Sequence, residues 1–103
     1  MLRNVESLYI NRDTGRVWFY YRGKWGKYSV YIDLEHLKYS CTCPAFLYKR
    51  KCKHIPLAAY LFWALPHLPI KVLCNIGLEY IEIINGKKYQ WIFKNNHVIM
   101  REV

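Results

Sequence analysis

The first third of the chain alternates between apolar and polar residues, a pattern that predicts β-strands. Residues 5–10, 16–21 and 28–34 follow this alternation and are rich in β-branched and aromatic side chains. Residues 11–15 and 22–26 separate them, and each of these turns contains a glycine able to take a positive φ. The pattern therefore predicts two antiparallel hairpins.

The last quarter of the chain repeats this pattern. Three more strands are predicted there, at residues 78–84, 88–94 and 98–103. Asn85-Gly86 and Asn95-Asn96 separate them, and both pairs favour tight turns. We expect an antiparallel meander, and a further short strand at residues 37–40 beside the third one.

Residues 55–65 predict the main helix. Every side chain there is apolar or aromatic apart from the hydroxyl of Tyr60, Pro56 suits a first helical turn, and Pro66 ends the run. A helix without a polar face needs cover on several sides, so either the sheet wraps it or a second copy of the chain does. We expect partial burial in a homodimer. Residues 67–75 fit a short helix or a strand.

Length and composition favour one compact domain spanning residues 1–103, because the chain is 53% hydrophobic and has no linker-like or repetitive tract. Residues 55–70 lack charged side chains, but a membrane span needs about 20 apolar residues and three prolines interrupt this run. Residues 1–11 lack the apolar run and cleavage site of a signal peptide. We expect no membrane insertion and an intracellular location, in the cytoplasm or, in a eukaryote, the nucleus.

The cysteines carry the clearest chemistry in the sequence. Inside a cell thiols stay reduced, so the cysteines are metal ligands or core residues rather than disulfides. Cys41, Cys43, Cys52 and His54 form the pattern C-x-C-x8-C-x-H. Side chains at i and i+2 of an extended segment point to the same side, and the loop at residues 44–51 is long enough to bring back the second pair. Four protein ligands match a closed, structural Zn²⁺ site.

Other interpretations of these residues are simpler. The four could be three buried cysteines and a hydrogen-bonded core histidine, whereas a disulfide between Cys41 and Cys43 would be badly strained. Cys74 stands apart and is interpreted as a small buried apolar residue. The remaining histidines have no neighbouring ligand cluster and are expected at the surface or in packing: His36, His67 and His97.

The segment around the cysteines resembles a SWIM-type zinc finger. Cys41-Thr42-Cys43-Pro44-Ala45-Phe46 is followed by Cys52-Lys53-His54-Ile55, with the strand at residues 28–32 before it and the apolar helix after it. The resemblance covers residues 28–65. It implies a zinc-stapled ββα unit with Cys41, Cys43, Cys52 and His54 as ligands. The predicted fold class is accordingly α+β, with flanking antiparallel hairpins or a meander and one main buried helix.

Net charge points to a polyanionic partner. The chain has 16 basic against 7 acidic residues, a formal charge of +9. Lys49, Arg50, Lys51 and Lys53 cluster at the zinc motif, and a site of three thiolates and Zn²⁺ carries a charge of only about −1 for them to balance. A second group interleaves basic and aromatic side chains: Arg22, Lys24, Trp25 and Lys27. Lys87 and Lys88 form a weaker third group. Such runs can also be simply solvated surface.

No catalytic motif is evident, so we expect no enzyme. Asp33 and Glu35 are interpreted as a solvated strand end. The leading expectation is binding of nucleic acid through the basic loops and without base specificity, with DNA favoured and RNA left open. The alternative is a protein-interaction adaptor for a recombination or transcription protein, docking through the consecutive aromatic residues 18–21. The resemblance implies DNA or protein binding and does not separate the two.

Overall fold

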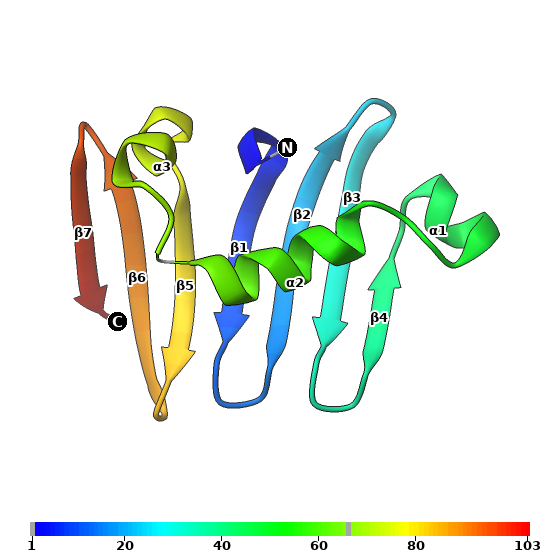
Figure 1. Cartoon of the computed structure of the whole chain (residues 1–103), viewed down its shortest axis with the longest axis horizontal. Helices are drawn as coiled ribbons and strands as arrows, with labels where there is room; N and C mark the ends of the chain where they lie inside the picture. Colours follow the sequence, from blue (N-terminus) through cyan, green and yellow to red (C-terminus); the bar gives the residue numbers. More distant parts are fainter. Residues whose placement is uncertain (1, 66) are drawn as a thin grey trace.

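The computed structural model describes residues 2–65 and 67–103 and has an α+β fold, as predicted (Figure 1). The strands are β1 (Val5–Asn11), β2 (Arg16–Gly23), β3 (Gly26–Asp33), β4 (Lys38–Cys41), β5 (Glu79–Ile84), β6 (Lys87–Lys94) and β7 (His97–Glu102). The helices are α1 (Pro44–Lys49), α2 (His54–Ala64) and α3 (Ile70–Ile76), preceded by a short 3₁₀ turn, η1 (Leu2–Asn4). All seven strands form one sheet in the order β4-β3-β2-β1-β5-β6-β7.

The sheet consists of two antiparallel units joined side by side. β1 to β4 form the predicted hairpins and the added fourth strand, and β5 to β7 form the predicted meander. The units meet where β1 pairs with β5 in parallel, with Leu8 opposite Tyr80. Parallel neighbours require a long crossover, here the chain segment that contains α2 and α3. The hydrophobic pattern of the sequence did not predict this pairing.

The core lies between α2 and the sheet, which α2 crosses in Figure 1. Phe19 and Val30 face the helix from β2 and β3, and Leu61 meets them from α2; all three are fully buried. The predicted helix is confirmed to within one residue at each end. Its outer side is apolar but exposed, since Tyr60 is 48% and Trp63 72% accessible. The homodimer expected from this apolar side stays a prediction.

The helices have modest lengths. Within residues 2–65 and 67–103, no helix is both long and apolar enough to cross a membrane.

The ambiguous segment at 67–75 contains helix α3 rather than a strand, and Gly77 ends that helix in the left-handed conformation with φ 62°. Leu73 of α3 is buried in the core, which explains why this short segment is helical at all.

The predicted loop at residues 44–51 contains a helix, α1, over residues 44–49. Pro44 starts α1, directly after the extended Cys43, because proline suits a first helical position. Phe46 is buried and attaches α1 to the core. Arg50 then takes a left-handed conformation, φ 58°, and its N–H donates to the carbonyl of Phe46, which ends the helix. The expected loop is therefore a short capped helix.

The prediction that Asp33 lies at a solvated strand end is wrong. Asp33 is 3% accessible, and its carboxylate accepts hydrogen bonds from the N–H groups of Glu35 and His36 and from the ring of His36 at 2.9 Å. Arg16 adds an ion pair at 3.4 Å. Glu35 is exposed, as predicted. Asp33 thus closes the β3–β4 turn as a buried hydrogen-bond acceptor.

Candidate metal centre

Three elements bring the four predicted ligands together. Cys41 is the last residue of β4, Cys43 immediately precedes α1, Cys52 lies in the link between α1 and α2, and His54 is the first residue of α2. One ligand atom from each residue lies within 4.8 Å of the others. The spacing C-x-C-x8-C-x-H therefore becomes one cluster in space, and α1 forms most of the chain segment that connects the two pairs of ligands.

The geometry of the cluster suits zinc. A tetrahedral Zn²⁺ ion with Zn–S bonds near 2.3 Å and a Zn–N bond near 2.0 Å sets its ligand atoms roughly 3.5–3.8 Å apart. Sγ of Cys41 lies 3.6 Å from Nδ1 of His54. Cys41, Cys43 and His54 are buried and Cys52 is half-buried. Four protein ligands leave no position for water or substrate, so the site fits a structural Zn²⁺ ion.

Burial opposes ionisation of the Cys41 and Cys43 thiols. It raises the pKa of the Cys41 thiol to about 12, and the neighbouring sulfurs of Cys43 and Cys52 add to that increase. Burial also opposes ionisation of Cys43, but hydrogen bonds to its sulfur, first from the N–H of Phe46, more than compensate and lower its pKa. A bound Zn²⁺ ion supplies the positive charge that stabilises all three thiolates.

His54 is prepared to act as a neutral ligand. Burial, with a contribution from the charge of Lys53, lowers the pKa of its imidazole, which favours the uncharged form that binds metals. The rings of Tyr21 and Tyr28 pack against it, with centroid distances of 4.3 and 5.9 Å. These two tyrosines were not predicted from the sequence. Their only signal is their position on the inward face of β2 and β3, and nothing in the cysteine motif points to them.

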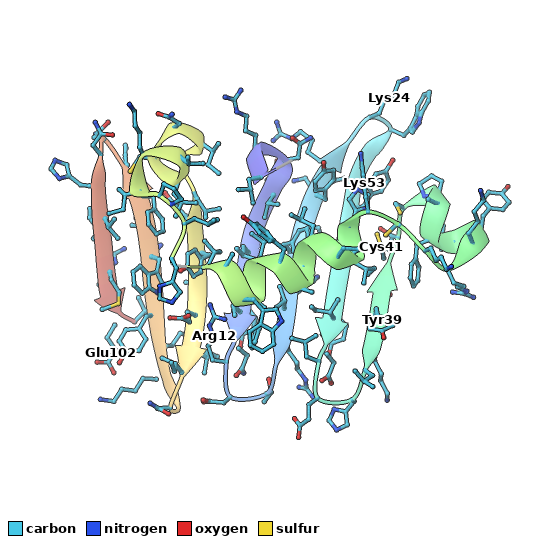
Figure 2. All side chains as sticks on the ribbon, in the orientation of Figure 1. Arg12, Lys24, Tyr39, Cys41, Lys53 and Glu102 are labelled. Carbon is cyan, nitrogen blue, oxygen red and sulfur yellow. The ribbon has the colours of Figure 1, made fainter. Side chains whose placement is uncertain are left out.

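The structure brings part of the two predicted basic groups together. Lys24 and Trp25, at the tip of the β2–β3 hairpin, line one cavity of about 440 Å³ with Lys53 and with Cys43, Cys52 and His54. Figure 2 shows Lys24 and Lys53 on the same edge of the molecule, above Cys41. Trp25 is 79% accessible, and Nζ of Lys24 lies 5.3 Å from the centroid of its ring.

The other predicted basic residues divide into two sets. Lys49, Arg50 and Lys51 are exposed at the end of α1. Arg22 and Lys27 point to Glu6 instead and form ion pairs with it at 2.5 and 3.1 Å. Lys87 and Lys88 start β6, on the other side of β1 from the zinc cluster. Lys24, Trp25 and Lys53 therefore lie beside the cluster, whereas Arg22 and Lys27 are held by Glu6.

Comparison with known proteins agrees with the geometry. Residues 28–61 match the family described as SWIM zinc finger, and this segment holds all four ligands. The chain thus contains a SWIM zinc finger, and the matched residues lie within the segment 28–65 predicted from the sequence. No curated protein and no solved structure matches the chain.

Proposed function

We propose that this protein binds nucleic acid, DNA or RNA, without base specificity. The zinc-side surface would make the contacts and consists of Lys24, Trp25, Lys49, Arg50, Lys51 and Lys53. The observation that carries the proposal is the cavity lined by Lys24, Trp25 and Lys53 beside the zinc ligands. Lysines attract phosphates, and an exposed tryptophan offers a stacking surface to an unpaired base.

The positive charge of the zinc-side surface is larger than the metal site needs, which supports an anionic partner. Three thiolates and Zn²⁺ give the site a charge of about −1, which one lysine can balance. The zinc-side surface has five basic residues and no acidic one, so the excess remains available to an anion. Arg22 and Lys27 contribute less, because Glu6 already neutralises part of their charge.

In this proposal the role of zinc is to hold residues of the binding surface in place, and zinc takes part in no reaction. We infer that β3, β4 and α2 form the ββα framework of the zinc finger, extended here by α1. The ligands join the end of β4 to the start of α2, and Lys53 lies between the ligands Cys52 and His54. Zinc would therefore hold Lys53 opposite Lys24, and its loss would separate the two lysines.

Salt dependence tests the proposal. In the double variant Lys49→Ala/Lys51→Ala, the slope of log K against log salt for a DNA duplex should become less steep by about one unit for each phosphate that the protein no longer binds. Arg50 stays in place because its left-handed conformation ends α1. The matched control Lys71→Ala/Lys87→Ala removes the same charge from exposed positions outside the zinc-side surface and should leave the slope unchanged. Equal changes in both double variants would contradict the proposal.

The second candidate is a protein-interaction adaptor. The exposed aromatic side chains of β2 support it, since Trp18 is 43% accessible and tryptophan is enriched in protein interfaces. An adaptor would return one stoichiometric protein in a pull-down and would bind DNA weakly at all salt concentrations. Tight, strongly salt-dependent DNA binding would favour the first candidate.

A further inference from the structure

One of the two faces of the sheet carries no helix within the described residues, 2–65 and 67–103. α2 packs on β2, β3 and β4, and α3 packs on β6 and β7. Both helices lie in front of the sheet in Figure 1, and their buried side chains share one core with Phe19 and Phe93. We call the opposite side, which carries the alternate residues of each strand, the open face.

A row of aromatic side chains crosses the open face. Tyr9 of β1 pairs with Trp18 of β2, which pairs with Tyr31 of β3. Neighbouring strands lie about 4.8 Å apart, so the three side chains are adjacent. Tyr20 follows Trp18 along β2 on the same face, with 5.5 Å between the two ring centroids. We call Tyr9, Trp18 and Tyr31 the aromatic row.

Beyond Tyr9, the same line of paired residues continues onto β5 and β6. Ile81 of β5 pairs with Tyr9, and Gln90 of β6 pairs with Ile81. A cavity of about 410 Å³ lies at this junction, and its lining includes Tyr9, Trp18, Ile81, Gln90, the neighbouring Ser7 and the acidic Glu79. Ser7 has φ 54° and lies where the register of β1 against β2 shifts, so a β-bulge borders the hollow. The open face thus combines flat rings with a recess beside them.

The charge of the open face is positive. By strand register its acidic residues are Glu6, Asp33 and Glu79, and its basic residues are Arg16, Arg22, Lys27, Lys38, Lys88, Lys94 and Arg101. Glu6 forms ion pairs with Arg22 and Lys27, and Asp33 forms one with Arg16. Within the described residues, Lys38, Lys88 and Lys94 form no ion pair, and they lie on both sides of the aromatic row.

We propose that the open face binds single-stranded nucleic acid, with unpaired bases stacked on the aromatic row and phosphates near Lys38, Lys88 and Lys94. The inference rests on the proposed function and adds to it a second surface, which takes single strands. Bases in a duplex are already stacked and cannot lie flat on protein rings, so this face selects single strands. A protein partner would bury the same rings, but an excess of basic side chains complements a polyphosphate chain better than a neutral interface.

Trp18→Ala tests the proposal directly. The probe is a fluorescent oligothymidylate of about 12 nucleotides, compared with the duplex of the same length. Removal of one stacking platform should weaken single-strand binding by about 5- to 150-fold and leave duplex binding nearly unchanged. Trp18→Phe should keep most of the affinity. The matched control is Trp63→Ala on the outer side of α2, where the tryptophan is even more exposed at 72%, and it should change neither affinity.

A second variant guards against a folding defect. Tyr31→Ala should also weaken single-strand binding more than duplex binding, and each variant is compared with the wild type for zinc content and thermal unfolding. Unchanged single-strand affinity in both alanine variants, or equal losses for single strand and duplex, would overturn the proposal. So would a change in self-association without a change in affinity, because the face would then pair with a second copy.

The two proposals fail in different ways. If Lys49→Ala/Lys51→Ala weakens binding and Trp18→Ala does not, the zinc-side surface remains the binding site and the open face does not take part. If the wild-type protein binds neither probe at low salt, both proposals are wrong.

Discussion

Nε of Arg12 lies 2.7 Å from Oε2 of Glu82, although 70 residues separate the two in the chain. The same guanidinium donates to the backbone carbonyls of Phe62 and Leu65 at the C-terminal end of α2. Arg12 thereby joins the end of β1 to β5 and to the helix above them. A cation at this position also suits the negative end of the helix dipole.

Arg12→Met should destabilise the fold strongly. The side chain of Glu82 is only 8% accessible, so removal of Arg12 leaves a buried carboxylate without its partner. We expect a loss of about 3–5 kcal/mol in the free energy of unfolding, measured by urea denaturation with zinc present. The double variant Arg12→Met/Glu82→Met should recover a large part of that loss, because no charge then remains buried. A double variant that is as unstable as the sum of the two single variants would contradict this account.

Cys52→Ser should lower the affinity for zinc by more than about tenfold. Cys52 is half-buried, so the substitution leaves no large cavity and its effect reports on ligation. The control is Cys74→Ser, since Cys74 is also half-buried but packs near β7, where its thiol lies 3.6 Å from the carbonyl oxygen of His97. Competition with a chromophoric chelator measures both affinities. Similar losses in the two variants would show that the cluster has no special role.

Asp33 should make stability depend on pH in the acidic range. The hydrogen bond from the His36 ring, aided by the N–H of His36 and by Arg16, outweighs burial and holds the pKa of Asp33 below its ordinary value of 3.8. The carboxylate therefore stabilises the fold above about pH 4, and this contribution is lost as the pH falls through the lowered pKa. The difference in melting temperature between wild type and Asp33→Asn should shrink over that range. Zinc release at low pH affects both proteins, so the difference between them still reports on Asp33. A constant difference would contradict the prediction.

Gly23→Ala should disturb the tyrosine that packs against His54. A Cβ at position 23 would collide with Cε2 in the ring of Tyr28. Overpacking of this kind costs about 1–3 kcal/mol, which chemical denaturation can measure. In a Tyr28→Ala background the same substitution should cost much less because the ring is absent. An equal cost in both backgrounds would mean that the backbone of Gly23 matters and the ring does not.

Local patterns in the sequence predicted much of this structure. Alternation located the strands, an uninterrupted apolar run located α2, and the spacing of Cys41, Cys43, Cys52 and His54 predicted the zinc cluster. These features depend on residues close together in the chain, so a short window contains the whole pattern.

Features that depend on distant residues were missed. Arg12 lies in a segment interpreted as a simple turn, yet its partner Glu82 comes from β5. Asp33 belongs here only in part, because Arg16 comes from the preceding strand, whereas its hydrogen bonds from Glu35 and His36 are local and were overlooked. The parallel pairing of β1 with β5 has no local pattern of its own. Helix α1 is different, since Pro44 at its first position was a local signal that the expectation of a loop overlooked.

X-ray absorption at the zinc edge of the purified protein tests the central claim most directly. The account predicts one zinc ion for each chain, with three sulfur ligands near 2.3 Å and one nitrogen ligand near 2.0 Å. A protein that folds without zinc, or one in which two of Cys41, Cys43 and Cys52 form a disulfide, would contradict it.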